Sequence, residues 1–243
     1  MSAVPDPKSA GHMTIWEHLG ELRSRLIKVS IAVVAGAVLG WFVFPYLLDF
    51  LLEPFQEIQP DGTVIATEPL QAFSLRIRMS GYIGIAIAMP VILWQLWRFI
   101  TPALYPHEKK YAVPFVLTSV VLFVLGGIVA LLTLQPALEF LLNIGGSDLQ
   151  PLLTADKYIS LVSLMILAFG LAFEFPVILL FLLIARVLDT RQLRHWRRYA
   201  AVVIVAFAAI ITPSQDPYSL FAMAVPMYLF YEGCIIIGRI MKR

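Results

Sequence analysis

The stretch PALYPHEKKY, residues 102–111, decides how this chain folds, because it separates two long apolar runs. The preceding run covers residues 73–97, and the following run covers residues 113–134. Each run is long enough for a helix across the hydrocarbon core of a bilayer, which takes about 20 apolar residues. The polar stretch between them is therefore a short loop at one face of a membrane. Its acid, Glu108, is followed by two lysines, and an acid among bases at such a position needs an explanation.

The composition places the chain among integral membrane proteins. Of its 243 residues, 60% are hydrophobic and only 14% are charged, and the mean hydropathy is +0.83. About a quarter of the residues of a soluble domain are charged, so little of this chain remains for a soluble part. The net charge of +2 is spread over several short loops, and no nucleic-acid partner is expected.

Six apolar runs predict an all-α integral membrane protein with six transmembrane helices in a single domain, residues 1–243. The expected spans are residues 26–46, 73–97, 113–134, 158–185, 199–211 and 218–238. The fifth run is short, so it requires local thinning of the bilayer or shielding by neighbouring helices. No secretory signal peptide is expected, because the first run is longer than the apolar part of such a peptide.

Lysines and arginines are distributed unequally between the two faces that six spans imply. The N-terminal segment, the second and fourth loops and the C-terminal tail together hold 15 of the 18 basic residues. The opposite face has Arg76, Arg78 and Lys157, together with most of the acids. Because loops rich in lysine and arginine stay in the cytoplasm, both termini are predicted to be cytoplasmic. An even number of spans also requires both ends to lie on one side.

Prolines recur inside the apolar runs. Pro90, Pro176 and Pro226 each remove a backbone donor and are expected to bend their helices. The carbonyl groups that they release must be satisfied by neighbouring helices or by polar side chains. Three bent helices do not pack well as a straight bundle, so we expect a curved wall with a concave side.

An amphipathic helix is predicted before the first span. The segment TIWEHLGELRSRL, residues 14–26, has apolar residues at helical spacing on one face. Thr14 and Glu17 fit a capping box at its start. We therefore expect a helix over residues 14–25 that lies at the membrane interface and continues into the first span.

Glu21 in this helix has two interpretations. Pairing with Arg25 one turn later would stabilise the helix by only about 0.2–0.5 kcal/mol. Alternatively, Glu21 and Glu108 lie on the same membrane face, and each accepts one guanidinium group in a bidentate, charge-assisted pair. A lysine does not reproduce this planar fork, so two such acids would select a ligand with adjacent arginines.

Two polar residues lie within the apolar runs. Glu174 has no charged neighbour in the sequence, and an acid at a helix centre costs about 2.5–3.5 kcal/mol on membrane-insertion scales. It is interpreted either as a protonated acid that bonds a carbonyl released by Pro176 or as a binding or proton-linked group. Gln95 is expected to bond a neighbouring helix.

The motifs of several enzyme classes are absent from the sequence. None of the four histidines forms HExxH, and there is no G-x-S-x-G motif and no phosphate-binding GK[ST] loop. We therefore predict that the protein is not an enzyme, that it has no cofactor and no metal site, and that any transport it supports uses another source of energy. An ion-coupled secondary transporter of a small solute is the alternative function.

Six motifs, taken together, resemble those of the TatC family, the receptor subunit of twin-arginine protein translocases. In chain order they are HLGELRSRL (18–26), LLEPF (51–55), PVILWQLWRFITPALYPHEKK (90–110), FGLAFEFPV (169–177), ITPSQDPYS (211–219) and VPMYLFYE (225–232). The resemblance extends from about Thr14 to Arg239. It implies a glove-like fold of six helices in which the fifth and sixth are short.

The resemblance also implies a function and partners. Members of the family export folded proteins without the Sec system across the inner membrane of bacteria, or across archaeal or organellar membranes. They recognise twin-arginine signal peptides, they work with TatA- and TatB-like single-span proteins, and the proton-motive force drives transport. Self-association within a larger complex in the lipid bilayer is expected as well.

The family's signal-binding acids match Glu21 and Glu108, which would explain the acid in the second loop. Arg23 and Phe99 match other positions around that site. The sequence HEKK replaces the HERR of many members and preserves the charge.

Two further pairs of family positions can be matched. Pro54 and Asp216 match positions that cap the outer face, although TPSQDP is one residue longer than in some members. Glu174 and Gln95 match polar groups that line the concave face and contact partner helices.

Overall fold

The computed structural model describes residues 15–58, 68–100, 112–144 and 154–241. Nearly all of these residues are helical, and no β-strand occurs within these ranges. The helices are α1 (Ile15–Ile58), α2 (Gln71–Ile100), α3 (Ala112–Asn143), α4 (Ala155–Ala172), α5 (Phe175–Ile184), α6 (Thr190–His195), α7 (Arg197–Ile211) and α8 (Pro217–Ile240). The prediction of an all-α protein is confirmed.

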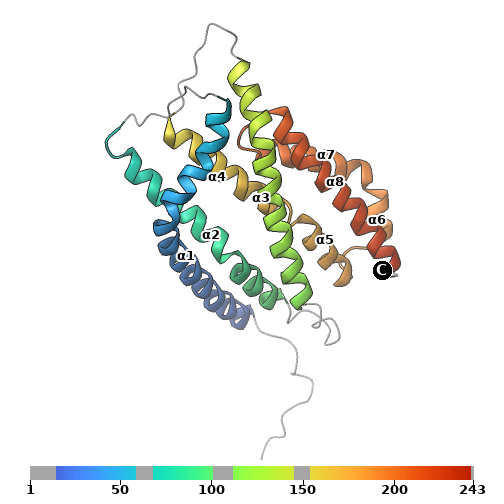
Figure 1. Cartoon of the computed structure of the whole chain (residues 1–243). Coiled ribbons are helices and arrows are strands. Elements are labelled where there is room, and N and C mark those ends of the chain that lie inside the picture. The colour runs from blue at the N-terminus through green and yellow to red at the C-terminus, as the bar shows by residue number, and fades with distance from the viewer. Residues whose placement is uncertain (1–14, 59–67, 101–111, 145–153, 242–243) are drawn as a thin grey trace, which may run out of the picture.

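The helices form a row rather than a closed ring of neighbours. The antiparallel pair α1–α2 packs against α3 and α4, α8 packs against α3, and α5 and α7 each pack against α8. Figure 1 shows that α1 and α3 begin, and α2 and α8 end, at the lower end of the bundle. We call this side the lower end, and the opposite side, where α2 and α8 begin, the upper end.

The predicted amphipathic segment and the first predicted span form one continuous helix. Helix α1 has 44 residues, so it is about 66 Å long at 1.5 Å per residue. A bilayer with its headgroups is about 40–45 Å thick. Helix α1 must therefore tilt strongly or extend beyond the bilayer.

By length and composition, five helical segments in the described part of the chain are suited to crossing a membrane. One of them, Ala155–Ile184, consists of α4 and α5 together. Helix α7 has only 15 residues and is about 22 Å long, shorter than the hydrocarbon core of about 30 Å. It corresponds to the short fifth run of the sequence, and the exact membrane boundaries of all six runs remain predictions.

Only one of the three prolines predicted to bend helices coincides with a break in a helix. Helix α4 ends at Ala172, and Pro176 lies in the first turn of α5. Pro90 and Pro226 lie inside the continuous helices α2 and α8. A proline inside a helix removes one hydrogen bond, and the remainder of the turn can persist where neighbours satisfy the released carbonyl.

Backbone contacts between glycines hold α1 against α2. A methyl group added at Gly84 would lie 2.6 Å from the nitrogen of Ala37, and one added at Gly36 would lie 2.8 Å from the Gly84 oxygen. Side chains at these positions would separate the helices. Lipid offers no hydrophobic drive for association between helices, so close approach through small residues supplies the packing energy.

A second crossing of the same kind joins α3 to α4. A methyl group at Gly126 would lie 2.5 Å from the carbonyl oxygen of Phe169 and 2.8 Å from the Cα of Gly170. The ring of Phe123 covers Gly170 from α3. Helices α3 and α4, against which the α1–α2 pair packs, are thus themselves in direct backbone contact.

Arg76 compensates for a proline in the neighbouring helix. Pro45 has no N–H, so the carbonyl of Trp41, four residues earlier in α1, has no helical donor. Arg76 of α2 donates to this oxygen from Nη2 at 2.9 Å and from Nε at 3.3 Å. Its guanidinium also lies 4.4 Å from the centre of the Trp41 ring. Arg76, near the upper end, is therefore hydrogen-bonded to the backbone of α1.

The α1–α2 crossing can be tested with a pair of glycines on one helix. Gly84→Ala should destabilise the protein by about 1–3 kcal/mol through overpacking. Gly81→Ala should be neutral or slightly stabilising, because alanine favours helix over glycine and a methyl group there meets nothing within 4 Å. The thermal unfolding midpoint of the purified protein in detergent measures both. Equal midpoints for the two variants would contradict the proposed contact.

The role of Arg76 can be tested with a double-mutant cycle. Arg76→Met should cost about 1–3 kcal/mol, because the Trp41 carbonyl loses its donor. With Pro45→Ala the chain regains an N–H for that carbonyl, so Arg76→Met should then cost about 1 kcal/mol less. The contact of Arg76 with the Trp41 ring is lost both with Pro45 and with Pro45→Ala in α1, so its contribution cancels when the two costs of Arg76→Met are compared. Arg78→Met, which breaks an ion pair with Asp156, is the control, and an identical cost of Arg76→Met in both backgrounds would refute the assignment.

Candidate functional site

A polar cluster joins α1 to α2 at the lower end of the bundle. Arg25 donates to Oε1 of Glu21 from Nη2 and, at 3.1 Å, from Nε. Its Nη1 donates to Oε1 of Gln95 in α2 at 3.3 Å. The side chains of Arg25 and Glu21 are only 13% and 22% exposed. The pairing of Glu21 with Arg25 that the sequence allowed is present, and it extends across to the second helix.

The second oxygen of Glu21 is unpaired within the described part of the chain. Its Oε2 atom is buried and has no hydrogen-bond partner among the described residues. A carboxylate accepts hydrogen bonds on both oxygens, and a buried oxygen without a donor is costly. Glu21 is therefore held in place through one oxygen, while the other remains available for a donor from a ligand.

An aromatic contact lies beside this cluster. The rings of His18 in α1 and Phe99 in α2 are stacked, with their centres 4.3 Å apart. His18 precedes Glu21 by three residues and so lies on the same side of α1. Arg23 is exposed and is turned roughly 200° from Glu21 around the helix. Phe99 and Glu21 thus share one surface, whereas Arg23 lies on another.

Glu108 lies outside the described residues. It belongs to the segment 101–111 between the end of α2 and the start of α3. Its distance from Glu21 therefore remains a prediction. Both flanking helix ends lie at the lower end of the bundle, where α1 also begins (Figure 1), and Glu21 lies in the second turn of α1.

Glu174 lies in a separate cavity. It occupies the break between α4 and α5, it is 6% exposed, and it hydrogen-bonds Ser119 of α3. Its Oε1 atom meets no hydrogen-bond donor in the part of the chain that the structure describes. The sequence suggested a carbonyl near Pro176 as the partner of this acid, but the structure gives it a serine hydroxyl.

The cavity that Glu174 faces is otherwise apolar. It has a volume of about 270 Å³ and is lined mainly by side chains of α2, α3 and α5, with Trp97 and Phe181 among them. Leu96 and Ile178 on its rim are half exposed, so the cavity opens toward the surroundings of the protein. Such an opening would admit a polar side chain of another helix to the free oxygen of Glu174.

Gln95 and Glu174 do not share a surface, although the sequence grouped them. Gln95 reaches Arg25 on the α1 side of α2, while Leu96 and Trp97 face the cavity of Glu174. A difference of one residue rotates a side chain by about 100° around a helix. Helix α2 therefore separates two polar sites.

At the upper end, Asp216 caps α8. It is 1% exposed, and it accepts hydrogen bonds from the backbone N–H of Ser219 at 2.8 Å and from the hydroxyl of Ser214. Gln215 has a positive φ of 51° in the tight turn before it. The burial of Asp216 is thus explained by helix capping.

Pro54, grouped with Asp216 by the sequence, is half-buried inside α1. Its neighbour Phe55 contacts the ring of Tyr158, and the Tyr158 hydroxyl donates to the carbonyl of Leu51 at 2.8 Å. Pro54 therefore belongs to the junction of α1 with α4, and Asp216 belongs to the start of α8.

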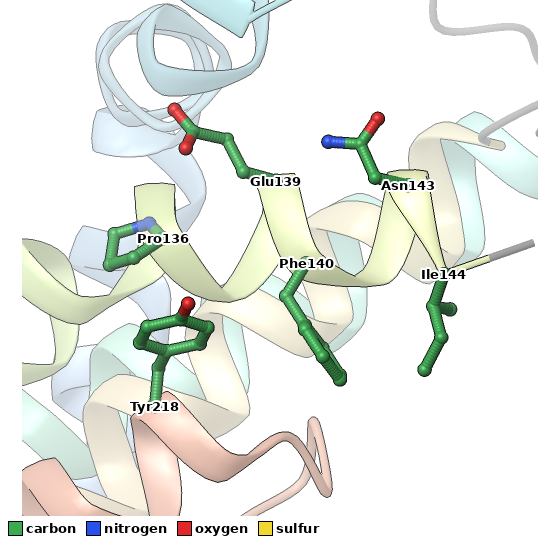
Figure 2. A pocket seen from close by; sticks show the side chains of 6 residues that line it. All are labelled: Pro136, Glu139, Phe140, Asn143, Ile144 and Tyr218. Carbon is green, nitrogen blue, oxygen red and sulfur yellow. The ribbon is translucent and has the colours of Figure 1, made fainter. Parts of the chain in front are cut away.

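A groove of about 390 Å³ lies next to the α8 cap, between the last turns of α3 and the start of α8. Figure 2 shows Phe140 and Tyr218 on one side of it, with ring centres 6.0 Å apart. Glu139 and Asn143 point to the other side of α3 (Figure 2). The groove has an aromatic wall and a polar rim. Within the described ranges, no three histidine, cysteine or acidic side chains are grouped as they would be around a metal ion.

Several polar contacts were not anticipated from the sequence, and three of them join different helices at buried or half-buried positions. These three are the Ser119 bond to Glu174, the Arg76 bonds to Trp41, and an ion pair between Arg197 and Glu232 with N–O distance 2.6 Å. Ser119 and Glu232 are polar residues inside or beside apolar runs, and this position was the only indication in the sequence that they form polar contacts. Their partners lie 35 or more residues away, so spacing alone could not identify them.

Comparisons with known proteins agree on one family. The family model described as "TatC: Sec-independent protein translocase protein" matches residues 17–226. A relative named Sec-independent protein translocase protein TatC from Frankia casuarinae is 40% identical over 241 residues, covering 93% of this chain and 65% of the relative. The protein of the same name from Aquifex aeolicus is 40% identical over 234 residues, covering 95% of this chain and 97% of the relative.

Solved structures show the same likeness. A crystal structure of the twin-arginine translocase receptor TatC superposes with a TM-score of 0.78 at 40% identity. The match covers 93% of this chain and 100% of the solved chain. It confirms the predicted fold class, an all-α protein with several membrane-spanning helices.

Proposed function

Because the chain belongs to the TatC family of Sec-independent protein translocase proteins, we propose that Glu21 and Glu108 bind the two arginines of a twin-arginine signal peptide. The protein is a multi-pass membrane receptor of the twin-arginine translocase and not an enzyme. A small-solute transporter, the alternative that the sequence allowed, is not favoured by these relatives.

The unpaired second oxygen of Glu21 is the observation that carries this proposal. Arg25 holds the carboxylate through Oε1 and leaves Oε2 buried without a donor among the described residues. A guanidinium of the signal peptide would supply that donor in a charge-assisted hydrogen bond. Arg25 and Gln95 act as positioning residues, because they fix the direction of the carboxylate.

The other residues of the site are assigned from their positions. Glu108 belongs to the loop that leaves α2 at the same end of the bundle and would bind the second arginine. Phe99 stacks on His18 beside Glu21 and offers an apolar surface to the peptide. Arg23 lies on the opposite side of α1, where it would contact lipid headgroups or a more distant part of the signal.

The charge distribution supports placing the lower end of the bundle in the cytoplasm. Exposed arginines at this end are Arg23, Arg98, Arg186, Arg191, Arg194, Arg198 and Arg239. At the upper end, Arg76 is bound to a backbone carbonyl and Arg78 to Asp156. Lys157 is the third basic residue there, and it is exposed. Free basic residues favour the cytoplasmic side. Both termini are then cytoplasmic, and signal peptides arrive at the inner membrane from that side.

We assign the cavity of Glu174 to partner helices. Its rim is open and its acid has a free oxygen, so a polar side chain of a TatA- or TatB-like single-span helix would bind there. Pro54 and Asp216 shape the upper end, where they limit access from outside. With no nucleotide-binding motif in the sequence, the proton-motive force is the proposed energy source, and the chain works within a larger, self-associated complex.

Substitution of either acid should remove the selection for arginine. A charge-assisted hydrogen bond contributes about 1.5–3 kcal/mol, and partial exposure reduces this value. Glu21→Ala or Glu108→Ala should therefore lower the preference for an Arg-Arg over a Lys-Lys signal peptide by about tenfold. Binding of both peptides to the purified variants in detergent measures this preference.

A control variant and a positioning variant separate recognition from general charge effects. Asp189→Asn removes a negative charge at the same end but keeps the α6 cap, and it should leave the preference intact. Arg25→Gln should lower the preference by less than Glu21→Ala does, because it removes a residue that orients the carboxylate and leaves the carboxylate itself in place. If both acid variants still distinguish the two peptides as the unmodified protein does, the assignment is wrong.

Glu174→Gln should be milder than Glu174→Ala. Glutamine retains hydrogen bonding to Ser119 and to a partner, whereas alanine leaves Ser119 unbonded and enlarges the cavity. Export of a folded reporter with a twin-arginine signal should persist in the first variant and fall by about tenfold or more in the second. Glu139→Ala, an acid outside the cavity, should export normally. Equal loss in both Glu174 variants would show that ionisation of the acid is required.

A further inference from the structure

A second groove lies between α5 and α7 in the lower half of the bundle. It has a volume of about 400 Å³. Leu179 of α5, Leu193 of α6, Val203 of α7 and Tyr231 of α8 line it, together with Trp196 before α7. It lies apart from Glu21 and from the cavity of Glu174, and none of the functions proposed above uses it.

The groove is bounded on one side by the contact between α6 and α8, and it is open toward the membrane. The Tyr231 hydroxyl donates to the carbonyl of Leu193 at 2.6 Å, which ties α6 to α8. On the open side, Tyr199 and Val203 are 62% and 64% exposed. Because both line the groove on α7, the groove faces the space that lipid occupies around the protein.

Positive charge gathers where the groove meets the lower end. Five arginines lie between residues 186 and 198, with a single acid, Asp189, among them. Arg197 is bound to Glu232. Arg194 and Arg198 are exposed and form no ion pair within the described part of the chain. Arg194 adjoins the groove residue Leu193 in α6, and Arg198 adjoins the groove residue Tyr199 in the first turn of α7. Both arginines therefore belong to the elements that form this end of the groove.

We propose that this groove binds an anionic phospholipid. One acyl chain lies along the apolar wall, and the phosphate contacts Arg194 and Arg198. Basic pockets between helices on the cytoplasmic side suit anionic headgroups, and tryptophan and tyrosine favour the headgroup level. A zwitterionic lipid would fill the groove without neutralising the two arginines, and an apolar partner helix would also leave them unpaired.

Trp196 gives this site an optical probe. The protein is placed in phosphatidylcholine vesicles with a small fraction of lipid brominated on its acyl chains, either phosphatidylglycerol or phosphatidylcholine. The difference between the unmodified protein and Trp196→Phe isolates quenching of Trp196. Brominated phosphatidylglycerol should quench this signal about fivefold more effectively than brominated phosphatidylcholine at equal mole fraction.

Charge variants test the headgroup contact. The double variant Arg194→Gln/Arg198→Gln should reduce quenching by phosphatidylglycerol to the level of phosphatidylcholine. The control Arg98→Gln/Arg239→Gln removes two exposed arginines at the same end and should leave the difference unchanged. A preference that survives the first double variant, or that disappears equally in both, overturns the proposal.

Groove variants test the acyl-chain contact. Val203→Phe fills the groove while every arginine remains, so it should abolish the selective quenching. Val202→Phe is its matched control, because Val202 is 69% exposed on the same helix but does not line the groove. An unchanged thermal midpoint confirms that each variant is folded. Equal quenching by both lipids in the unmodified protein, or protection of Trp196 from both by a signal peptide, assigns the groove to another occupant and refutes the proposal.

Discussion

Direct backbone contact between α1 and α2 determines where the polar groups of this protein meet. Gly36 and Gly84 allow the two helices to approach without intervening side chains. Below this crossing, Arg25 reaches Gln95, and His18 stacks on Phe99. Both contacts depend on the crossing, because side chains that extend only a few ångströms cannot span helices held apart. In a membrane such proximity comes from small residues rather than from hydrophobic collapse.

The upper half of the same pair shows how a membrane helix accommodates proline. Pro45 leaves the Trp41 carbonyl without a helical donor, and Arg76 supplies two hydrogen bonds in its place. Helix α1 continues without a break as a result. At Pro176 the helix is instead interrupted, and the interruption contains Glu174. At Pro45 the long helix is thus continuous, and at Pro176 the interruption creates a position for a buried acid.

Helix α2 lies between the two proposed binding regions. Gln95 takes part in the cluster around Glu21, while Leu96 and Trp97 line the cavity of Glu174. Signal recognition and partner docking, as proposed, would therefore use opposite sides of one helix. The α5–α7 groove lies at a third location, beside arginines that neither region uses. Lipid at that groove would contact α6 and α7, the segment whose short length calls for a locally adapted bilayer.

The sequence by itself determined the helical class and the order of the helices, because long apolar runs in lipid leave helix as the conformation that satisfies the backbone. It also offered the pairing of Glu21 with Arg25 as one of two interpretations, because that contact needs only helical spacing. The tertiary structure alone decided that Gln95 faces α1 and not Glu174. It also decided that Ser119 hydrogen-bonds Glu174 and that Arg76 donates to the carbonyl of Trp41. These choices depend on helix rotation and crossing, to which distant residues contribute, and periodicity within one helix carries no information about its neighbour.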